Sequence, residues 1–415
     1  MKICIVAGEA SGDLLGALLI NALKNIIPPR PPGEGQGERE IEFYGIAGPK
    51  MQAAGAVSLF PMEALSVRGY VEALSALPRI LWIRKRLIHH CLDNPPDLFI
   101  GIDAPDFNLG VETRLKAAGI PTVHFVSPSV WAWRANRLQK MAMAADHTLL
   151  IFPMEQALYA AAGLSATYVG HPFAHHLPLR NEKAARLRLK LDPQQKQVVL
   201  MPGSRVSELK ALADLCVLTA KQLHSTQPGV QFLVPLVTRE TLVLFEAAMS
   251  RHDAWGLPIR ILFGHAHDAL EAADCALIAS GTASLEGLLL GCPHLITYKV
   301  PKLTAWIMRR KAKLKRGQNE VSAQANIGVA DVKPQSGGRS QKPRVGLPNF
   351  LANRDLVPEF LQEDAEPQRL ADALATLLND PAAAEAQRSA FAEIREQLTR
   401  DTPRLIAEAL RPFCK

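Results

Sequence analysis

One β-α-β unit, in residues 96–134, constrains the fold of this chain more than any other stretch. Residues 98–102 are a short apolar run, which is typical of a buried parallel strand. A helical segment follows at residues 109–118, and a second apolar run covers residues 121–126. Parallel strands joined by a helix belong to sheets that helices cover on both faces. The chain is therefore predicted to be an α/β protein.

Carboxylates and aromatic rings follow the two predicted strands of this unit. Asp103 and Asp106 come directly after the first strand, and residues 127–134 after the second hold two serines, two tryptophans and an arginine. Open α/β sheets bind ligands at this end of their strands, which favours a chemical role for Asp103. Asp106 better fits the N-cap of the helix that follows. Helix caps and a rim of packed aromatic rings are the alternative for the whole group.

The composition indicates a large protein without a membrane span. A length of 415 residues suffices for two or three domains, and 48% of the residues are hydrophobic. No window approaches about eighteen uninterrupted apolar residues, and Glu9 and Asp13 interrupt the first apolar run too early for a signal peptide. The six cysteines form no Cys-x-x-Cys pair, which favours reduced core residues in the cytosol. A net charge of +7 favours an acidic partner: nucleic acid, anionic lipid or a phosphorylated substrate.

The first predicted strand, residues 2–7, ends in a glycine-containing turn that opens a helix to about residue 25. The backbone at such a turn can approach a ligand closely, and a helix N-terminus favours anions. Acidic side chains in this turn would repel phosphate, so recognition of hydroxyl groups fits better, with the candidates Glu9, Ser11, Gly12 and Asp13. An ordinary strand-to-helix turn explains the stretch equally well. Further along, residues 62–88 are predicted to be helical with a break at Pro78.

A second α/β half is predicted beyond residues 173–196, a charged and irregular segment that marks the best domain boundary. Strands are expected at residues 197–201, 231–235, 260–263, 276–279 and 294–297. The run at 294–297 is expected to be the last strand. The predicted architecture is two doubly wound parallel sheets followed by a helical C-terminus. The expected domains are residues 1–180, 181–365 and 366–415.

Two strand ends of the second half offer groups that suit a nucleotide. Hydroxyls and backbone N–H groups at a helix N-terminus can cradle a diphosphate, and here they come from Ser280, Gly281, Thr282 and Ser284. Glu286, one turn into that helix, could accept hydrogen bonds from ribose hydroxyls. At the other strand end, Gly203 and Ser204 precede Arg205, whose guanidinium can bind phosphate through two hydrogen bonds. Serines also cap helices, so each motif alone is a weak signal.

Residues 302–316 combine seven Lys and Arg with an apolar face and no acidic residue. A basic helix of this kind lies on anionic membranes, and the predicted contacts are Trp306, Arg309, Arg310, Lys311 and Lys313. A solvated surface helix is the alternative. Residues 317–344 are polar and low in aromatics, which predicts a disordered loop without chemistry.

Taken together, these motifs give the chain a close resemblance to the lipid-A-disaccharide synthase family, inverting glycosyltransferases of the GT-B fold. The matching segments occur in the family's order, at residues 6–13, 101–108, 126–134, 202–205, 280–286 and 347–349. The chain departs from the family pattern in a longer link at residues 28–40, in Arg68 where an apolar residue is usual, and in an insertion at residues 317–344. No matched motif is lost.

The resemblance implies that UDP-2,3-diacylglucosamine donates its sugar to the 6-hydroxyl of 2,3-diacylglucosamine 1-phosphate. The products would be the β-1,6-linked lipid A disaccharide 1-phosphate and UDP. The resemblance implies two Rossmann-like halves facing a cleft, the first binding the acceptor and the second the UDP-sugar. It further implies a cytoplasmic enzyme that rests on the inner membrane of a Gram-negative cell, and a homodimer whose C-terminal parts are swapped.

The resemblance also implies roles for the candidate residues. Asp103 would be the general base on the acceptor hydroxyl. The UDP-binding set would be Gly203, Ser204, Arg205, Ser280, Gly281, Thr282, Ser284, Glu286 and Asn349. The acceptor-binding set would be Glu9, Ser11, Gly12, Asp13, Ser127, Trp131 and Arg134. No Asp-x-Asp motif or His and Cys cluster occurs, so no metal and no other cofactor is expected, and protein donors would stabilise the leaving UDP.

Two other functions stay open from the residues alone. The first is a different nucleotide-sugar enzyme of the same fold, such as a polyprenyl-linked muramyl glycosyltransferase or a UDP-sugar 2-epimerase. The strand end at Asp103 and the tryptophan segment after it argue against this function. The second is a non-catalytic module that binds anionic lipid or nucleic acid, which the net charge allows. The basic residues concentrate at residues 302–316, however, and no nucleic-acid-binding module occurs.

Overall fold

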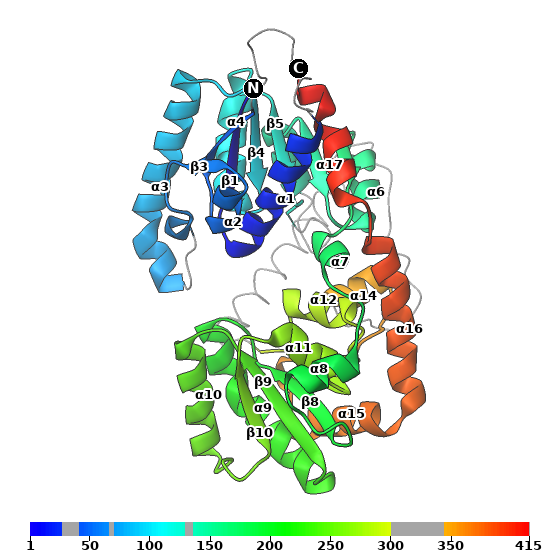
Figure 1. The fold of residues 1–415 in the computed structure, drawn as a ribbon. Helices are drawn as coiled ribbons and strands as arrows, with labels where there is room; N and C mark the ends of the chain where they lie inside the picture. Colours follow the sequence, from blue (N-terminus) through cyan, green and yellow to red (C-terminus); the bar gives the residue numbers. More distant parts are fainter. Residues whose placement is uncertain (27–40, 66–69, 129–135, 300–343, 415) are drawn as a thin grey trace, which may run out of the picture. The chain divides into compact units, whose positions relative to one another are not determined.

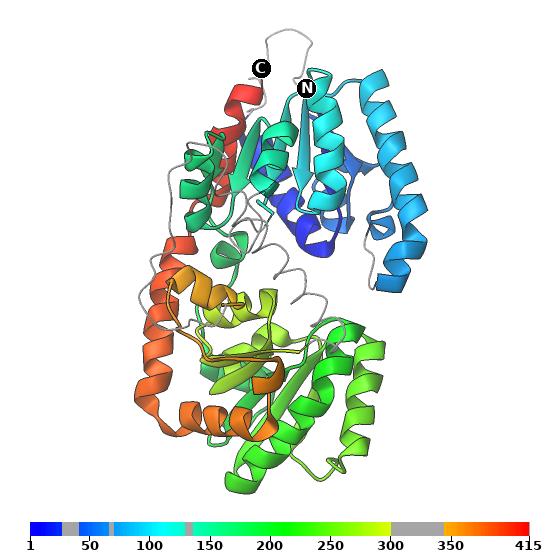
Figure 2. The same ribbon diagram turned by 180° about the vertical axis from the view of Figure 1, so that it is seen from behind.

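The computed structural model describes residues 1–26, 41–65, 70–128, 136–299 and 344–414. The chain forms two compact units, which we call the first unit (residues 1–177 and 395–415) and the second unit (residues 178–394). Each unit is a parallel β-sheet with helices on both faces (Figure 1, Figure 2). The predicted α/β class and its two doubly wound sheets are therefore confirmed.

The first unit has a seven-stranded sheet in the order β3-β2-β1-β4-β5-β6-β7, in which all neighbours are parallel. Its strands are β1 (Lys2–Ala7), β2 (Glu42–Ile46), β3 (Ala56–Ser58), β4 (Leu98–Ile102), β5 (Thr122–Phe125), β6 (His147–Leu150) and β7 (Ala166–Tyr168). The strand order reverses between β1 and β4, and ligands of such sheets bind at the carboxyl ends of these two strands. Both are central strands and almost wholly buried, which explains their unbroken apolar sequences.

The helices of the first unit fill the connections between its strands. They are α1 (Ala10–Ile26), α2 (Pro49–Ala53), α3 (Tyr70–Asp93), α4 (Pro105–Ala117), α5 (Asn136–Ala144), α6 (Pro153–Ala161) and α7 (Pro172–His176). A further helix, α17 (Thr402–Leu410), returns from the end of the chain and packs on α1. Its Ile406 and Leu410 are fully buried, so the end of the chain belongs to the core of the first unit.

The second unit has a six-stranded parallel sheet in the order β10-β9-β8-β11-β12-β13. Its strands are β8 (Lys196–Met201), β9 (Val230–Leu236), β10 (Ile259–Phe263), β11 (Cys275–Ala279), β12 (His294–Tyr298) and β13 (Glu359–Leu361). Its helices are α8 (Glu182–Arg188), α9 (Val206–Thr226), α10 (Arg239–Arg251), α11 (Ala266–Ala272), α12 (Thr282–Leu289), α14 (Leu347–Ala352) and α15 (Pro367–Asn379), and α16 (Pro381–Leu398) leads out of it. The order reverses between β8 and β11, the two strands whose ends carry the predicted nucleotide motifs.

Three predictions about secondary structure are wrong. Pro78 lies inside α3 and does not end the helix. The segment 173–196 is not irregular, because it holds part of α7 and all of α8. Strand β12 is not the last, because β13 adds to the edge of the sheet beside it. The predicted link at residues 28–40 and the basic helix at residues 302–316 lie outside the described residues, as does all of the predicted loop except Arg344.

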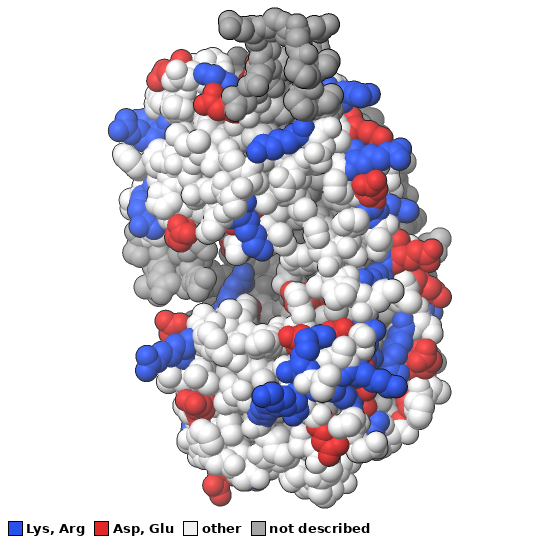
Figure 3. All heavy atoms as spheres, in the orientation of Figure 1, with Lys and Arg blue, Asp and Glu red and all other residues white. Residues whose placement is uncertain are grey.

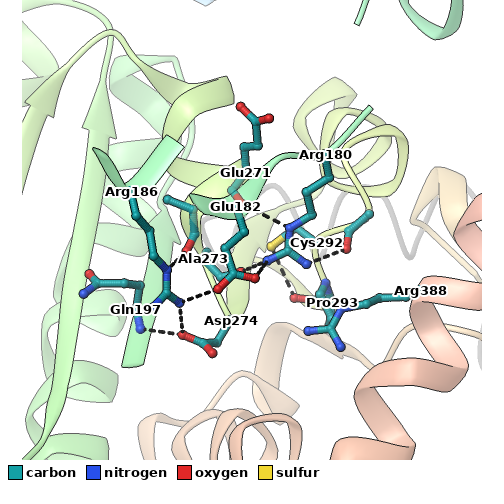
Figure 4. A network of polar contacts seen from close by, with 12 residues as sticks. Arg180, Glu182, Arg186, Gln197, Glu271, Ala273, Asp274, Cys292, Pro293 and Arg388 are labelled. Carbon is teal, nitrogen blue, oxygen red and sulfur yellow. Dashed lines mark hydrogen bonds and ion pairs between the residues drawn. The ribbon is translucent and has the colours of Figure 1, made fainter. Parts of the chain in front are cut away.

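Basic side chains gather over the part of the second unit that holds α8 and α11, with carboxylates between them (Figure 3). The buried guanidinium of Arg186 is the centre of a polar network beneath this surface (Figure 4). It donates to the backbone oxygens of Ala272 at 3.0 Å and Pro193 at 2.9 Å and to the carboxylate of Asp274 at 2.8 Å. Much of the positive charge here is therefore paired within the protein and fastens α8 to the second sheet.

Two other sequence expectations concern the membrane and the cysteines. Among the residues that the structure describes, no helix has the length and apolar character needed to cross a bilayer. All six cysteines are free thiols, and five of them are buried, as expected for core residues. Burial raises the pKa of the thiols of Cys216 and Cys292 to about 12, which keeps both protonated and unreactive.

Candidate active site

The turn after β4 holds Asp103 in an unusual backbone conformation. Asp103 and Ala104 have φ angles of 49° and 44°, a left-handed region that non-glycine residues rarely occupy. The turn is fixed by hydrogen bonds, because the Asp103 N–H donates to the Phe125 oxygen at 2.8 Å and the Asn108 amide donates to the Asp103 oxygen at 2.9 Å. Strained backbone of this kind costs about 1–3 kcal/mol per residue and clusters at functional sites.

The Asp103 carboxyl is partly buried at this strand end. Burial raises its pKa, while the positive charge of His124 and a backbone hydrogen bond from Ala104 limit the rise. A carboxylate with a raised pKa is a better proton acceptor than an exposed one. Asp106, in contrast, is exposed and lies inside the first turn of α4, whose N-cap is Ala104. The predicted N-cap role of Asp106 is therefore wrong, although its charge still suits the positive end of the helix.

The turn between β1 and α1 lies beside Asp103. A Cβ added at Gly8 would come within 3.0 Å of the Ala104 Cβ, so the two turns are in contact. Glu9 and Ser11 are exposed at this edge, and Gly12 is buried. Asp13 is buried and accepts hydrogen bonds from the N–H groups of Lys50 and Met51, both at 2.9 Å. Asp13 therefore holds the start of α2 and fits a structural role better than a ligand contact.

The other predicted acceptor residues follow β5. Ser127 is buried, and its hydroxyl lies 2.9 Å from that of Tyr159 on α6. Burial raises the pKa of Tyr159 to about 12, so this phenol stays neutral. Val126, just before Ser127, has a φ of 78°, which is a strained value for a β-branched residue. Trp131 and Arg134 lie outside the described residues.

In the second unit, the turn after β8 presents Arg205. Its side chain is 66% exposed, and among the described residues it forms a long ion pair with Glu208, 4.0 Å from Nη1. The Glu208 carboxylate accepts from the N–H groups of Ser204 at 2.8 Å and Arg205 at 3.1 Å. Gly203 has a φ of 116°, and a Cβ there would lie 2.4 Å from this carboxylate. The turn thus leaves the guanidinium exposed to a ligand, while Glu208, which no sequence motif indicated, accepts hydrogen bonds from the backbone amides.

The turn after β11 opens α12 at Thr282. Gly281 and Thr282 are exposed, whereas Ser284 is buried and its hydroxyl donates to the Gly281 oxygen at 2.7 Å. Glu286 lies 3.0 Å from Nε2 of His267, and this hydrogen bond raises the pKa of the imidazole. His267 comes from α11, and no sequence signal relates it to Glu286. The exposed Thr282 and the partly exposed Glu286 are open to a ligand, and Ser284 shapes the turn.

Asn349 on α14 is buried, and its side-chain amide is fully used. The amide nitrogen donates to the Val357 oxygen at 2.8 Å and to the Glu359 carboxylate at 2.7 Å. The amide oxygen accepts from the N–H groups of Leu356 and Val357. Asn349 therefore holds α14 to the segment before β13 and has no hydrogen-bonding capacity left for UDP. Across the described parts of both units, no three His, Cys, Asp or Glu side chains converge as metal ligands would.

Comparison with known sequences shows a protein family to which this chain is similar. A family model described as lipid-A-disaccharide synthetase matches residues 3–327. The chain is 46% identical over 412 residues to a lipid-A-disaccharide synthase of Methylobacillus flagellatus, and the match covers 99% of both chains. It is 47% identical over 412 residues to the synthase of Dechloromonas aromatica, covering 99% of this chain and 98% of the relative.

Solved structures share the fold at much lower identity. The UDP-GlcNAc 2-epimerase of Neisseria meningitidis, bound to UDP-GlcNAc, superposes with a TM-score of 0.56 at 12% identity, covering 100% of this chain and 98% of that one. The calicheamicin glycosyltransferase CalG4 gives a TM-score of 0.53 at 12% identity, covering 99% and 97%. These matches bear out the GT-B-like fold, and at such identities they say nothing more.

Proposed function

Because the chain belongs to the lipid-A-disaccharide synthase family, and is therefore a glycosyltransferase of lipid A biosynthesis, we propose that Asp103 is the general base of its reaction. The acceptor is 2,3-diacylglucosamine 1-phosphate and the donor is UDP-2,3-diacylglucosamine. As the acceptor 6-oxygen attacks C1 of the donor sugar, its proton passes to Asp103. The bond from C1 to the UDP oxygen breaks at the same time, and UDP leaves with the electron pair. Attack on the face opposite UDP inverts the configuration at C1.

The observation that supports this role is the position of Asp103 at the β1–β4 reversal. The carboxylate stands at the edge where doubly wound sheets bind their ligands. Its strained turn is fixed by Asn108 and by the backbone of β5, so the backbone that carries the carboxylate is fixed before substrate arrives. Its raised pKa makes it a stronger proton acceptor than an exposed carboxylate.

The leaving UDP needs positive charge and hydrogen-bond donors. We propose that Arg205 pairs with a phosphate and that the N-terminus of α12, at Gly281 and Thr282, donates to the diphosphate. Glu286 accepts from ribose hydroxyls, and His267 holds its carboxylate in place at 3.0 Å. Gly203 and Ser204 shape the turn that presents Arg205, and Ser284 shapes the start of α12. In the first unit, Glu9, Ser11, Gly12 and Ser127 are the proposed acceptor contacts, together with Trp131 and Arg134.

The test is the turnover of Asp103→Asn on purified acylated substrates. The amide keeps the shape of the side chain and loses the base, so kcat should fall about 10²- to 10⁴-fold. UDP affinity, measured by calorimetry, should stay within about twofold, because Asp103 makes no contact with UDP in this proposal. Asp106→Asn is the matched control, since this exposed carboxylate should matter little. A variant at position 103 with more than about a tenth of parental turnover would refute the assignment.

We also propose that the enzyme associates peripherally with the cytoplasmic face of the inner membrane. The predicted basic helix supports this proposal through Trp306, Arg309, Arg310, Lys311 and Lys313. In the described part of the chain, α3 exposes Leu77, Leu81 and Trp82. The Trp82 side chain is 53% exposed, and the guanidinium carbon of Arg86 lies 5.4 Å from the centre of its ring. An exposed apolar stripe beside arginine suits an anionic interface.

Vesicle sedimentation tests the association with the membrane. Leu81→Gln with Trp82→Gln should reduce binding to vesicles that contain anionic lipid. Val237→Gln with Val243→Gln, at two exposed apolar residues of the second unit, serves as the control. Equal binding by all variants would exclude α3 as a membrane contact.

A swapped homodimer is a separate proposal. Sedimentation equilibrium of the full chain tests it, because a monomeric mass would contradict it.

A further inference from the structure

Beneath Asp103, the first unit contains a buried carboxylate and a buried histidine in direct contact. Glu112 on α4 and His124 on β5 are both 0% exposed, and Oε1 of Glu112 lies 2.7 Å from Nδ1 of His124. Neither residue contacts solvent, and neither follows from the family motifs in the sequence. Burying two ionisable groups costs free energy unless they are paired, so their presence needs an explanation.

The backbone of β4 makes room for the pair. Gly101 is the residue that faces His124 across the β4–β5 ladder. A Cβ at Gly101 would lie 2.1 Å from Oε1 of Glu112 and 2.9 Å from the Cβ of Asn108. The carboxylate therefore reaches the sheet through the space that this glycine leaves. The same Asn108 donates to the backbone oxygens of Ile102 and Asp103, so the pair and the Asp103 turn share one packed cluster.

Other buried histidines show what Glu112 does to His124. Burial without a carboxylate partner lowers the pKa of His171 and His294 to about 4. Burial acts in the same direction on His124, yet the charge and hydrogen bond of Glu112, together with the charge of Asp103, raise the pKa of this imidazole. His124 therefore binds a proton more readily than the other two buried histidines.

The charge on His124 acts in turn on Asp103. Burial raises the pKa of Asp103, and His124 is the largest influence that opposes it. Among the described residues, Tyr159 and Glu155 on α6 also belong to this neighbourhood: Tyr159 stays neutral, and the charge of Glu155 acts on Tyr159. Arg84 on α3 carries a positive charge, but its guanidinium reaches the backbone oxygen of Asp106 at 3.5 Å and is not among the groups that shift the pKa of Asp103.

We propose that Glu112 and His124 are a positioning pair that keeps Asp103 ionised, and thus ready to accept a proton, in the resting enzyme. This inference rests on the proposed role of Asp103 as the base. Glu112 holds the proton on His124, and the imidazolium stabilises the Asp103 carboxylate against the cost of its burial. When Asp103 takes the proton of the acceptor hydroxyl, the pair stays as it was and moves no proton itself.

The test is the pH dependence of kcat for Glu112→Gln and His124→Gln in the full chain. Either change removes the positive charge beside Asp103, so Asp103 should become protonated at higher pH than in the parent. The acidic limb of the pH profile then moves to higher pH. We expect turnover to be at least about tenfold below the parent at pH 5.5 and within about threefold of it at pH 8.5, where Asp103 is ionised again. The double variant should show no larger shift than either single variant, because both remove the same charge.

A matched control separates this effect from a loss of packing. Glu155→Gln makes the same change at another carboxylate of the first unit that is 0% exposed, and its profile should keep the parental shape. Melting temperatures of all variants show whether the fold is intact, and His124→Gln serves if Glu112→Gln does not fold. A loss of turnover that is equal at every pH, or an unshifted acidic limb in a folded variant, overturns the inference.

The failure of the base assignment gives a different result. If Asp103→Asn keeps its turnover, the proposed base is wrong and the pair loses its purpose with it. If Asp103→Asn is inactive while Glu112→Gln and His124→Gln keep the parental pH profile, the base assignment stands and only the positioning pair is refuted.

Discussion

Replacing Arg186 with methionine should destabilise the second unit by about 3 kcal/mol. Arg186 is buried, and its guanidinium donates to three backbone oxygens and to the Asp274 carboxylate. Methionine fills much of the same volume and offers no donor. Breaking a buried ion pair from one side costs about 3–5 kcal/mol, because the other charge is left without its partner. Asp274 keeps Lys196 at 3.0 Å and the Gln197 N–H at 2.8 Å, so the lower end of this range applies.

Hydrogen exchange measured by mass spectrometry can locate this loss within the chain. Peptides from β8 and β11 exchange through opening of the second unit, and 3 kcal/mol corresponds to an increase in their exchange rate on the order of 10²-fold. A peptide from β1 reports the first unit and should not change. Arg251→Met is the matched control, because Arg251 pairs with Asp214 on the surface, where such pairs contribute less than about 1 kcal/mol. An increase below about fivefold in β8 and β11 would refute the reasoning.

Two further substitutions test the assignments in the second unit. Arg205→Ala should weaken UDP binding by about 1.5–3 kcal/mol, because a charged hydrogen bond to phosphate is lost, and unchanged UDP affinity by calorimetry would remove Arg205 from the site. Asn349→Ala should lower the melting temperature, because it leaves the buried N–H groups of Leu356 and Val357 without their acceptor. Each unpaired group costs up to about 3 kcal/mol. The same variant should leave UDP affinity unchanged. Weaker UDP binding in a stably folded Asn349 variant would instead restore Asn349 as a ligand contact.

The sequence predicts the frame of the candidate site because strand ends leave a clear signal. The runs at residues 2–7 and 98–102 are predicted with the same bounds that β1 and β4 have in the structure. Central strands of a parallel sheet are buried on both faces, so their apolar runs are unbroken and end where the turn begins. For this reason Asp103 could be placed at a ligand-binding edge from the sequence alone.

The residues that surround Asp103 could not be predicted in the same way. Glu112 lies in a helix among charged residues and resembles a solvent-facing side chain, while His124 stands alone between apolar neighbours. Their contact depends on how α4 packs over β4 and β5, which periodicity does not determine. Asn349 shows the converse case: its motif predicts a ligand contact, and in the structure its side-chain amide makes four hydrogen bonds within the chain.

Edge elements were missed for a related reason. Strand β13 has only three residues, and a run that short has no detectable alternation.

Pro78 suggested a break in the helix. A proline inside a long helix removes a single backbone hydrogen bond, however, and α3 continues through it.

The packing of α17 on α1 has a consequence for how this protein is made. The whole second unit lies between these two helices in the chain. A chain that leaves the ribosome N-terminus first therefore carries an unfinished first unit until α17 has been synthesised, with the face of α1 that packs on α17 still uncovered. Loss of residues 402–410 would accordingly harm the half of the protein that is synthesised earliest.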